Sequence, residues 1–239
     1  MNIYLLINLF ILNVVFCDES KFTYKGGWPI NPTSNEINDP GFNLPCPGNV
    51  GCECIEDSDC INNNCNAHPK GNFCNPKKGD LIPRFEGLDQ FGQSVDLYDF
   101  ANQDKIIILE LSAGWCSPCN DLASWIATND LEITNNRWWK DRYFPIRDMI
   151  NSGEVILINC MYEGFEKKIT VTPHDVQKWY DMYPDPNVPI LADEYRFLHS
   201  WVMPTGLPTI FLIDENMQLI NYSNRGLTEA FMYLTQPKK

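Results

Sequence analysis

Two thiols separated by two residues offer the clearest chemistry in this sequence, in the run Trp115-Cys116-Ser117-Pro118-Cys119. The apolar stretch 105–113 precedes the run, and residues 120–128 follow it with helical periodicity. A Cys-x-x-Cys pair between a strand and a helix is a position for a reactive dithiol, because the unpaired helix amides favour a thiolate there. The alternative is an inert structural disulfide, but so short a loop contributes little loop-closure entropy.

The elements that must position this pair follow from the apolar pattern. Residues 105–113 are rich in Ile and Leu without alternation, which is typical of a central strand covered on both faces. Further strands are predicted at 82–85, 94–97, 155–161, 189–191, 208–213 and 217–222. Helices are predicted from about 116, within 129–153 with its end before Ser152, and at 173–180, 195–201 and 227–234. This order predicts an α/β fold with a central mixed sheet and helices on both faces.

Length and charge limit the function classes. The 239 residues suggest one full-sized domain with a smaller addition. A formal net charge of -13 argues against nucleic-acid binding, because no basic surface is available to neutralise phosphates.

The first 45 residues are read as two segments. Residues 3–16 are almost wholly apolar, which has the length of a signal-peptide core and falls short of a membrane span, so 1–17 is predicted to be a signal peptide. If this segment is cleaved, only lipidation of Cys17 would bring the protein to a membrane. The other alternative is an uncleaved anchor or a buried N-terminal helix. Residues 18–45 are rich in Gly and Pro and are predicted to form a linker or loosely ordered arm.

Residues 46–80 form a small cysteine-rich module with few large apolar side chains. Its cysteines are Cys46, Cys52, Cys54, Cys60, Cys65 and Cys74. Such a segment cannot bury enough apolar surface to fold unaided, so three disulfides are expected, with their pairing left open. A zinc site that includes His68, or a calcium loop at the acidic run 53–59, are the weaker readings. Dense cysteines together with a signal peptide indicate an oxidising, extracytoplasmic compartment, periplasmic or secreted.

Residues 81–239 resemble the thioredoxin superfamily. Two motifs in order carry the resemblance: Trp115-Cys116-Ser117-Pro118-Cys119 after a buried strand, and Gly206-Leu207-Pro208-Thr209 about ninety residues later. The lead-in 82–97 and the run 206–214 are similar to its TlpA-like/AhpC-TSA (redoxin) branch. The residue after the second cysteine departs from thioredoxin itself, being Asn120 where a Lys is common.

The resemblance implies roles for the site residues. Cys116 is expected to be the exposed nucleophile, and Cys119 the buried thiol that resolves the mixed disulfide. Trp115 and Leu207 are expected to contact substrate, and Pro208 resembles the cis-proline that faces the dithiol. Glu110 stands where the family commonly has a buried acid that accepts the Cys119 proton, although a surface position at the strand end is equally open. Outside this site, Cys160 is read as a buried core cysteine.

The resulting hypothesis is an extracytoplasmic thiol–disulfide oxidoreductase without cofactor or metal. It would act on protein dithiols and disulfides through Cys116 and Cys119, with an upstream redox partner. A thiol peroxidase is an alternative, but the Pro-x-x-x-Thr-x-x-Cys context of that group is absent. Two further alternatives are a secreted binding or adaptor protein and a copper-handling protein. Copper handling is disfavoured because copper-binding relatives use Cys-x3-Cys, whereas this sequence has Cys-x2-Cys.

Overall fold

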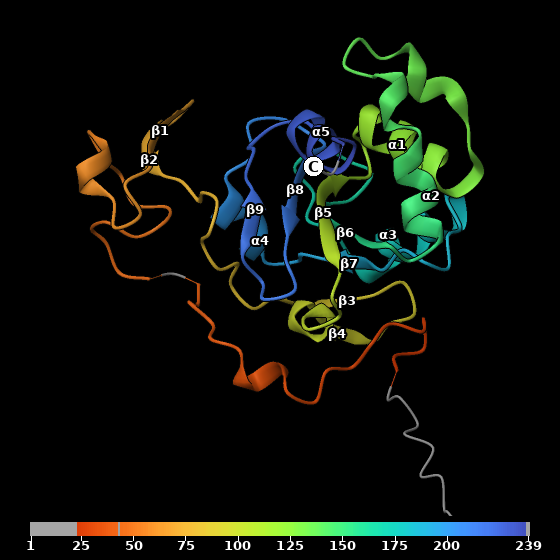
Figure 1. Ribbon diagram of the computed structural model, residues 1–239, viewed down its shortest axis with the longest axis horizontal. Coiled ribbons are helices and arrows are strands. Elements are labelled where there is room, and N and C mark those ends of the chain that lie inside the picture. Colours follow the sequence, from red (N-terminus) through yellow and green to blue (C-terminus); the bar gives the residue numbers. More distant parts are fainter. Residues whose placement is uncertain (1–22, 43, 238–239) are drawn as a thin grey trace, which may run out of the picture.

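A computed structural model describes residues 23–42 and 44–237, so the predicted signal peptide and Cys17 lie outside the described residues. In the described part, one sheet of seven strands has the order β4-β3-β7-β6-β5-β8-β9 (Figure 1). Its strands are β3 (Glu86–Leu88), β4 (Ser94–Asp96), β5 (Ile106–Ala113), β6 (Val155–Glu163), β7 (Ile190–Ala192), β8 (Thr209–Ile213) and β9 (Leu219–Asn221). β5, β6 and β7 run parallel, whereas β3, β4, β8 and β9 pair antiparallel to their neighbours, so the sheet is mixed.

Helices cover both faces of this sheet, with the one that follows the Cys-x-x-Cys run packed close to its centre. They are α1 (Ser117–Thr128), α2 (Pro145–Asn151), α3 (Pro173–Met182), α4 (Phe197–Val202) and α5 (Thr228–Leu234). Short 3-10 turns occur at 34–36, 57–59, 97–100, 131–135 and 141–143. The predicted order of strands and helices is therefore confirmed from β5 to α5.

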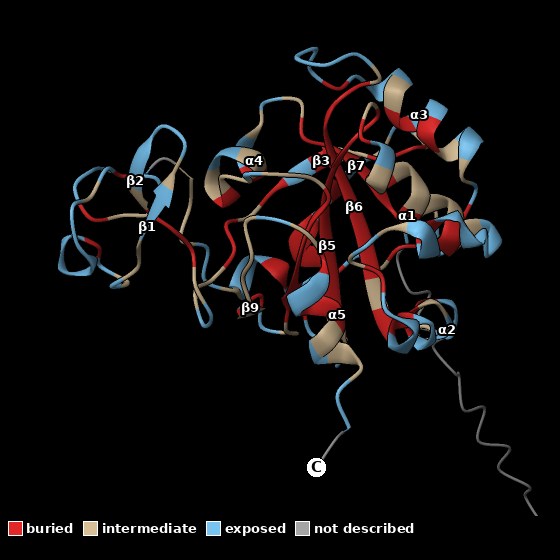
Figure 2. Cartoon of the chain, turned by 90° about the horizontal axis from the view of Figure 1, so that it is seen from above, coloured by how far each residue is buried: buried red, intermediate tan, exposed pale blue. Residues whose placement is uncertain are grey.

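β5 divides the core into two layers, because successive side chains of a strand point to opposite faces. Ile107 and Leu109 pack in the cluster that contains Leu198 of α4. Ile108 packs in the cluster that contains Leu122 of α1 and residues of α2 and α5. Figure 2 shows β5 and β6 as buried throughout most of their length. The expected α/β architecture, a mixed sheet with helices on both faces, is confirmed.

The first strand of the domain lies later than predicted. Residues 82–85 approach the sheet without joining a ladder, and pairing begins at Glu86, opposite Asp96 of β4. Pro83 has no amide hydrogen to donate to a ladder, which explains why the strand starts beyond it. Ile82 and Phe85 are nevertheless buried in the core.

Residues 23–42 lie along the domain, where the sequence predicts a linker or loosely ordered arm. Trp28 is buried, and its indole Nε1 donates a 2.9 Å hydrogen bond to Asp89. The buried carboxylate of Asp99 accepts from the Tyr24 hydroxyl at 2.5 Å and from the Asn31 amide at 3.0 Å. A composition rich in Gly and Pro predicts a segment without regular helix or strand. Such a segment can still pack its few large side chains against the domain, as Trp28 does.

The cysteine-rich module is a hairpin of β1 (Cys65–His68) and β2 (Gly71–Cys74) with irregular loops, at one side of the sheet (Figure 1). Its disulfides join Cys46 to Cys52, Cys54 to Cys65 and Cys60 to Cys74. The sulfurs of Cys54, Cys60 and Cys74 lie within 4.8 Å of one another, and each belongs to a disulfide. Disulfides thus form the small core that apolar side chains do not supply.

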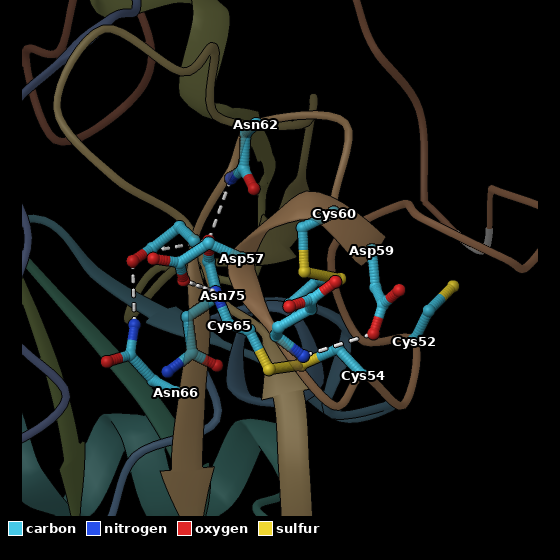
Figure 3. The surroundings of a disulfide bond; sticks show 12 residues. Cys52, Cys54, Asp57, Asp59, Cys60, Asn62, Cys65, Asn66 and Asn75 are labelled. Atoms are coloured by element: carbon cyan, nitrogen blue, oxygen red, sulfur yellow. Dashed lines mark hydrogen bonds between the residues drawn. A yellow bond between two sulfur atoms is a disulfide. The ribbon is translucent and has the colours of Figure 1, made fainter.

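In the acidic run of the module, the Asp59 carboxylate binds backbone amides of the same run. The Asp59 carboxylate accepts hydrogen bonds from the amides of Ile55 and Glu56, at 2.7 and 3.1 Å, beside the Cys54–Cys65 disulfide (Figure 3). These backbone hydrogen bonds lower the pKa of Asp59. Its role in the structure is to fix the loop that leads to Cys60.

The described residues include no helix that combines the length and the apolar character required to cross a membrane.

Candidate functional site

Cys116 and Cys119 lie at the start of α1, immediately after β5. Cys116 is the residue that caps the helix, Pro118 occupies its first turn, and the two sulfurs form a disulfide. The Cys119 amide donates to the Cys116 sulfur at 3.3 Å, and the Cys116 carbonyl accepts from the Cys119 and Asn120 amides. Unpaired amides at a helix start stabilise negative charge, so the first sulfur is placed to exist as a thiolate.

The expectation that Cys116 is exposed is wrong for this oxidised form. Cys116 is only 3% exposed and Cys119 is fully buried, while the intervening Ser117 is exposed. Both sulfurs belong to an apolar cluster against which Trp115 and Leu207 pack, and this packing covers the disulfide.

Trp115 is held in place by an acid at the end of the neighbouring strand. Its indole Nε1 donates a 2.7 Å hydrogen bond to Glu163, and Glu163 also forms a 2.8 Å ion pair with Arg196. The Glu163 backbone carbonyl accepts from the Gly114 amide at 3.1 Å. Glu163 therefore fixes both the backbone and the indole that lead into Cys116.

The sequence alone did not single out Glu163, although a signal for it exists. β5 and β6 are parallel, and Ala113 is paired with Glu163. Because the carboxyl ends of parallel strands meet at the same edge of a sheet, a polar residue that ends β6 is expected beside the dithiol.

Glu110 is buried, which decides between the two positions that the sequence left open. It is 1% exposed, and its Oε2 accepts a 3.0 Å hydrogen bond from Asn159 Nδ2. Burial raises the pKa of Glu110 from 4.5 to about 8, against the smaller lowering effect of the Asn159 hydrogen bond. The carboxyl therefore has a proton affinity suited to exchange with a thiol near neutral pH.

Glu110 lines a cavity next to α1. Among the described residues Oε1 has no hydrogen-bond partner. A cavity of about 20 Å³ is lined by Glu110, Leu122, Ala123 and Asp185, among others, and has room for about one water molecule. Cys119 lies three and four residues before Leu122 and Ala123, hence on the same helix face one turn away.

Leu207 and Pro208 lie in the loop before β8. The Leu207–Pro208 peptide bond is cis, and Pro208 is buried while Leu207 is partly exposed. Leu207 packs on the cluster that contains both cysteines. Its backbone amide and carbonyl make no hydrogen bond within the described part of the chain, whereas the Pro208 carbonyl accepts from Gly226. The Leu207 backbone is thus free to pair with an extended chain next to the dithiol.

Asn120 connects the dithiol turn to the rest of the domain, in the place where the resemblance would favour a Lys. Its Nδ2 donates to the carbonyls of Cys116 and Gly114, at 2.7 and 3.2 Å. Its Oδ1 accepts a 2.9 Å hydrogen bond from the Tyr183 hydroxyl. The side chain therefore stabilises the turn and carries no charge.

The structure brings Trp115 and Leu207 against both cysteines, and Pro208 follows Leu207. Glu110 lies on β5 and lines the cavity beside Leu122 and Ala123 of α1. Cys160, in contrast, is a free and fully buried cysteine of β6 that packs in the core cluster of α4. Burial raises the pKa of its thiol well above the usual value. Nothing in this environment favours a reactive thiolate.

Comparisons with known proteins add a likeness of fold. No family model matches the chain, and no curated protein matches it. Solved structures that resemble it include the thioredoxin domain of a thiol-disulfide oxidoreductase from Bacteroides vulgatus, with 18% identity and a TM-score of 0.43 over 66% of this chain and 98% of that one. A putative thiol:disulfide interchange protein DsbE from Chlorobium tepidum has 18% identity and a TM-score of 0.45 over 66% and 96%.

Peroxidoxin BcpB from Mycobacterium tuberculosis is a third such structure, with 16% identity and a TM-score of 0.45 over 66% of this chain and 93% of that chain. These likenesses are weak and carry no conclusion about activity.

Proposed function

We propose that this protein is an extracytoplasmic thiol–disulfide oxidoreductase that exchanges disulfides with protein partners through Cys116 and Cys119. The observation that carries the proposal is the disulfide at the start of α1, in which a helix amide points at the Cys116 sulfur at 3.3 Å. A purely structural disulfide needs no such amide. The same hydrogen bond would stabilise the thiolate that attacks a partner.

The exchange runs in two balanced steps. In the reduced protein, the Cys116 thiolate attacks one sulfur of a partner disulfide, so a mixed disulfide forms and the partner's other sulfur leaves as a thiolate. Cys119 then loses its proton and attacks the Cys116 sulfur, which closes the Cys116–Cys119 disulfide and releases the second partner thiol. Two electrons pass to the partner, and the reverse sequence oxidises a partner dithiol.

Three groups support these steps from fixed positions. In its ionised form, Glu110 is the general base that takes the Cys119 proton, directly or through a water in the adjoining cavity. The free backbone of Leu207 pairs with the partner chain, and Trp115 covers the reacting sulfurs beside it. The three module disulfides support an oxidising location for the protein.

A pair of cysteine variants tests the proposal. Cys119→Ser retains the nucleophile but cannot resolve, so it should accumulate a mixed disulfide with a disulfide-bonded substrate protein, detected by non-reducing electrophoresis and mass spectrometry. Cys116→Ser should show neither turnover nor trapping. Cys160→Ala is the matched control, since it removes a thiol outside the site and should exchange at the wild-type rate. Full turnover by Cys116→Ser would exclude the proposed role of the pair.

A further inference from the structure

Two lysines lie over aromatic rings next to the dithiol. The exposed Lys167 has its Nζ 4.7 Å from the centre of the Trp115 ring. The exposed Lys178 has its Nζ 3.9 Å from the centre of the Phe165 ring, and Phe165 lies against Gly114, where an added Cβ would come within 2.9 Å of its ring. Both cations are therefore held by rings that contact the backbone leading into Cys116.

An arginine lies against the other element of the site, the loop before Pro208. A Cβ added at Gly206 would lie 3.0 Å from Nε of Arg225, so this exposed side chain packs on the residue before Leu207. The Thr205 amide donates to the Asn224 carbonyl at 2.8 Å, which ties the two turns together. We call Lys167, Lys178 and Arg225 the cationic rim.

The cationic rim has no counter-charge within the part of the chain that the structure describes. The ion pairs found there are Arg84–Asp96 and Arg196–Glu163. Two acids near the rim have other partners: Glu163 binds Trp115 and Arg196, and Asp175 caps α3 through Thr172. A third, Glu166, precedes Lys167 in the sequence and is exposed, and it forms no ion pair with the rim. What distinguishes these three cations is their position beside the dithiol, in a chain whose net charge is -13.

We propose that the cationic rim selects protein partners that carry Asp or Glu next to the cysteine that reacts. This inference rests on the proposed function, and it names the class of partner. A carboxylate next to the partner's disulfide would come to lie near Lys167 or Lys178 on one side of the dithiol, or near Arg225 beside Leu207. The surrounding negative charge does not oppose such contacts strongly, because salt screens charges beyond about 8 Å at physiological ionic strength.

The expected effect is moderate and measurable. An exposed ion pair contributes little by itself, so each cation should change the exchange rate by about two- to fivefold. With several of them engaged, a probe with flanking acids should exchange about ten times faster than one with flanking lysines.

The experiment uses three cyclic disulfide peptides that differ only in the residues flanking their cysteines, which are Glu, Gln or Lys. Second-order rate constants are measured for the full-length reduced protein at about 0.15 M salt, near the ionic strength at which distant charges are screened. The wild type should follow the order Glu, Gln, Lys. In the double variant Lys167→Glu with Arg225→Glu this order should reverse.

The readout is the ratio of the exchange rate with the Glu peptide to that with the Lys peptide. A charge change near Cys116 also alters the reactivity of the thiolate, but this changes the rates of all three peptides by the same factor. Lys78→Glu is the matched control and should retain the wild-type order. Lys78 is exposed, and the amide of its neighbour Gly79 donates to the Leu219 carbonyl. Leu219 pairs with Ile213, which pairs with Ile107 near the start of β5, so Lys78 lies at the end of the sheet away from Cys116.

Equal rates for the three peptides, or an order that the double variant leaves unchanged, would overturn the partner preference while leaving the proposed function intact. Failure of all three peptides to exchange would overturn the proposed function and the partner preference together.

Discussion

Replacement of Glu110 by Gln should make the folded protein more stable at alkaline pH and leave it unchanged at acid pH. Below pH 4.5, Glu110 is protonated in both the folded and the unfolded protein, so its carboxyl and the Gln amide behave alike. As the pH rises from 4.5 to about 8, the unfolded chain releases this proton and the folded protein keeps it. The wild type must therefore lose stability across this window, and the Gln variant must not.

The magnitude follows from the difference between the two pKa values. One pKa unit corresponds to about 1.4 kcal/mol, so the free energy of unfolding of the wild type should fall by about 1.4 kcal/mol per pH unit relative to the variant. The total difference reaches about 5 kcal/mol above pH 8, as an order of magnitude. The Asn159 hydrogen bond is kept in the variant, because the Gln carbonyl can accept it in place of Oε2.

Urea unfolding of both proteins between about pH 4 and pH 9, with the disulfides oxidised, measures this difference, because the slope in urea changes little for such a substitution. In the oxidised form Cys116 and Cys119 do not titrate, so they do not contribute to the pH profile. Glu229→Gln, an exposed change on α5, is the control and should give a flat difference. A flat or falling difference for Glu110→Gln would refute the buried, proton-holding carboxyl.

Two further predictions concern the parts outside the site. Trp28→Ala should lower the free energy of unfolding by about 3 to 5 kcal/mol, because it leaves a cavity where the buried indole packs. Trp28→Phe should lower it by only about 1 kcal/mol, through the lost hydrogen bond to Asp89. If both variants unfolded at the wild-type urea midpoint, residues 23–42 would not stabilise the domain. Replacing Cys60 and Cys74 by Ala should destabilise the module by about 3 kcal/mol and make it sensitive to protease, with exchange at the dithiol unchanged; a loss of exchange activity would instead show that the module takes part.

The sequence predicts the centre of the fold well because the signal there is strong. Residues 106–113 and 155–163 are predominantly apolar and do not alternate with polar residues, which is typical of a strand covered on both faces. The edge elements are short, so the position of a single residue without an amide hydrogen, Pro83, moves the start of β3 beyond the predicted 82–85.

Contacts between distant segments are what the sequence could not provide. Asp99 and Trp28 have no periodic pattern around them, yet the first binds Tyr24 and Asn31 and the second is buried. In the site, the two cysteines could be predicted from their type and spacing, whereas Pro208 and the role of Glu110 were implied by the resemblance. Glu163 ends a strand that is parallel to β5, which was a signal for it, but its pairing with Ala113 comes from the structure.

The central claim is that Cys116 and Cys119 form an exchange couple and are not a structural disulfide. Equilibration of the full-length protein with glutathione buffers of graded potential, followed by alkylation and mass mapping, tests it directly. We predict that Cys116 and Cys119 become reduced together in one two-electron step between about -270 and -120 mV, while the three module disulfides stay intact because structural disulfides lie below about -300 mV. Reduction of the Cys116–Cys119 disulfide only at the potential of the module disulfides would contradict the proposed function.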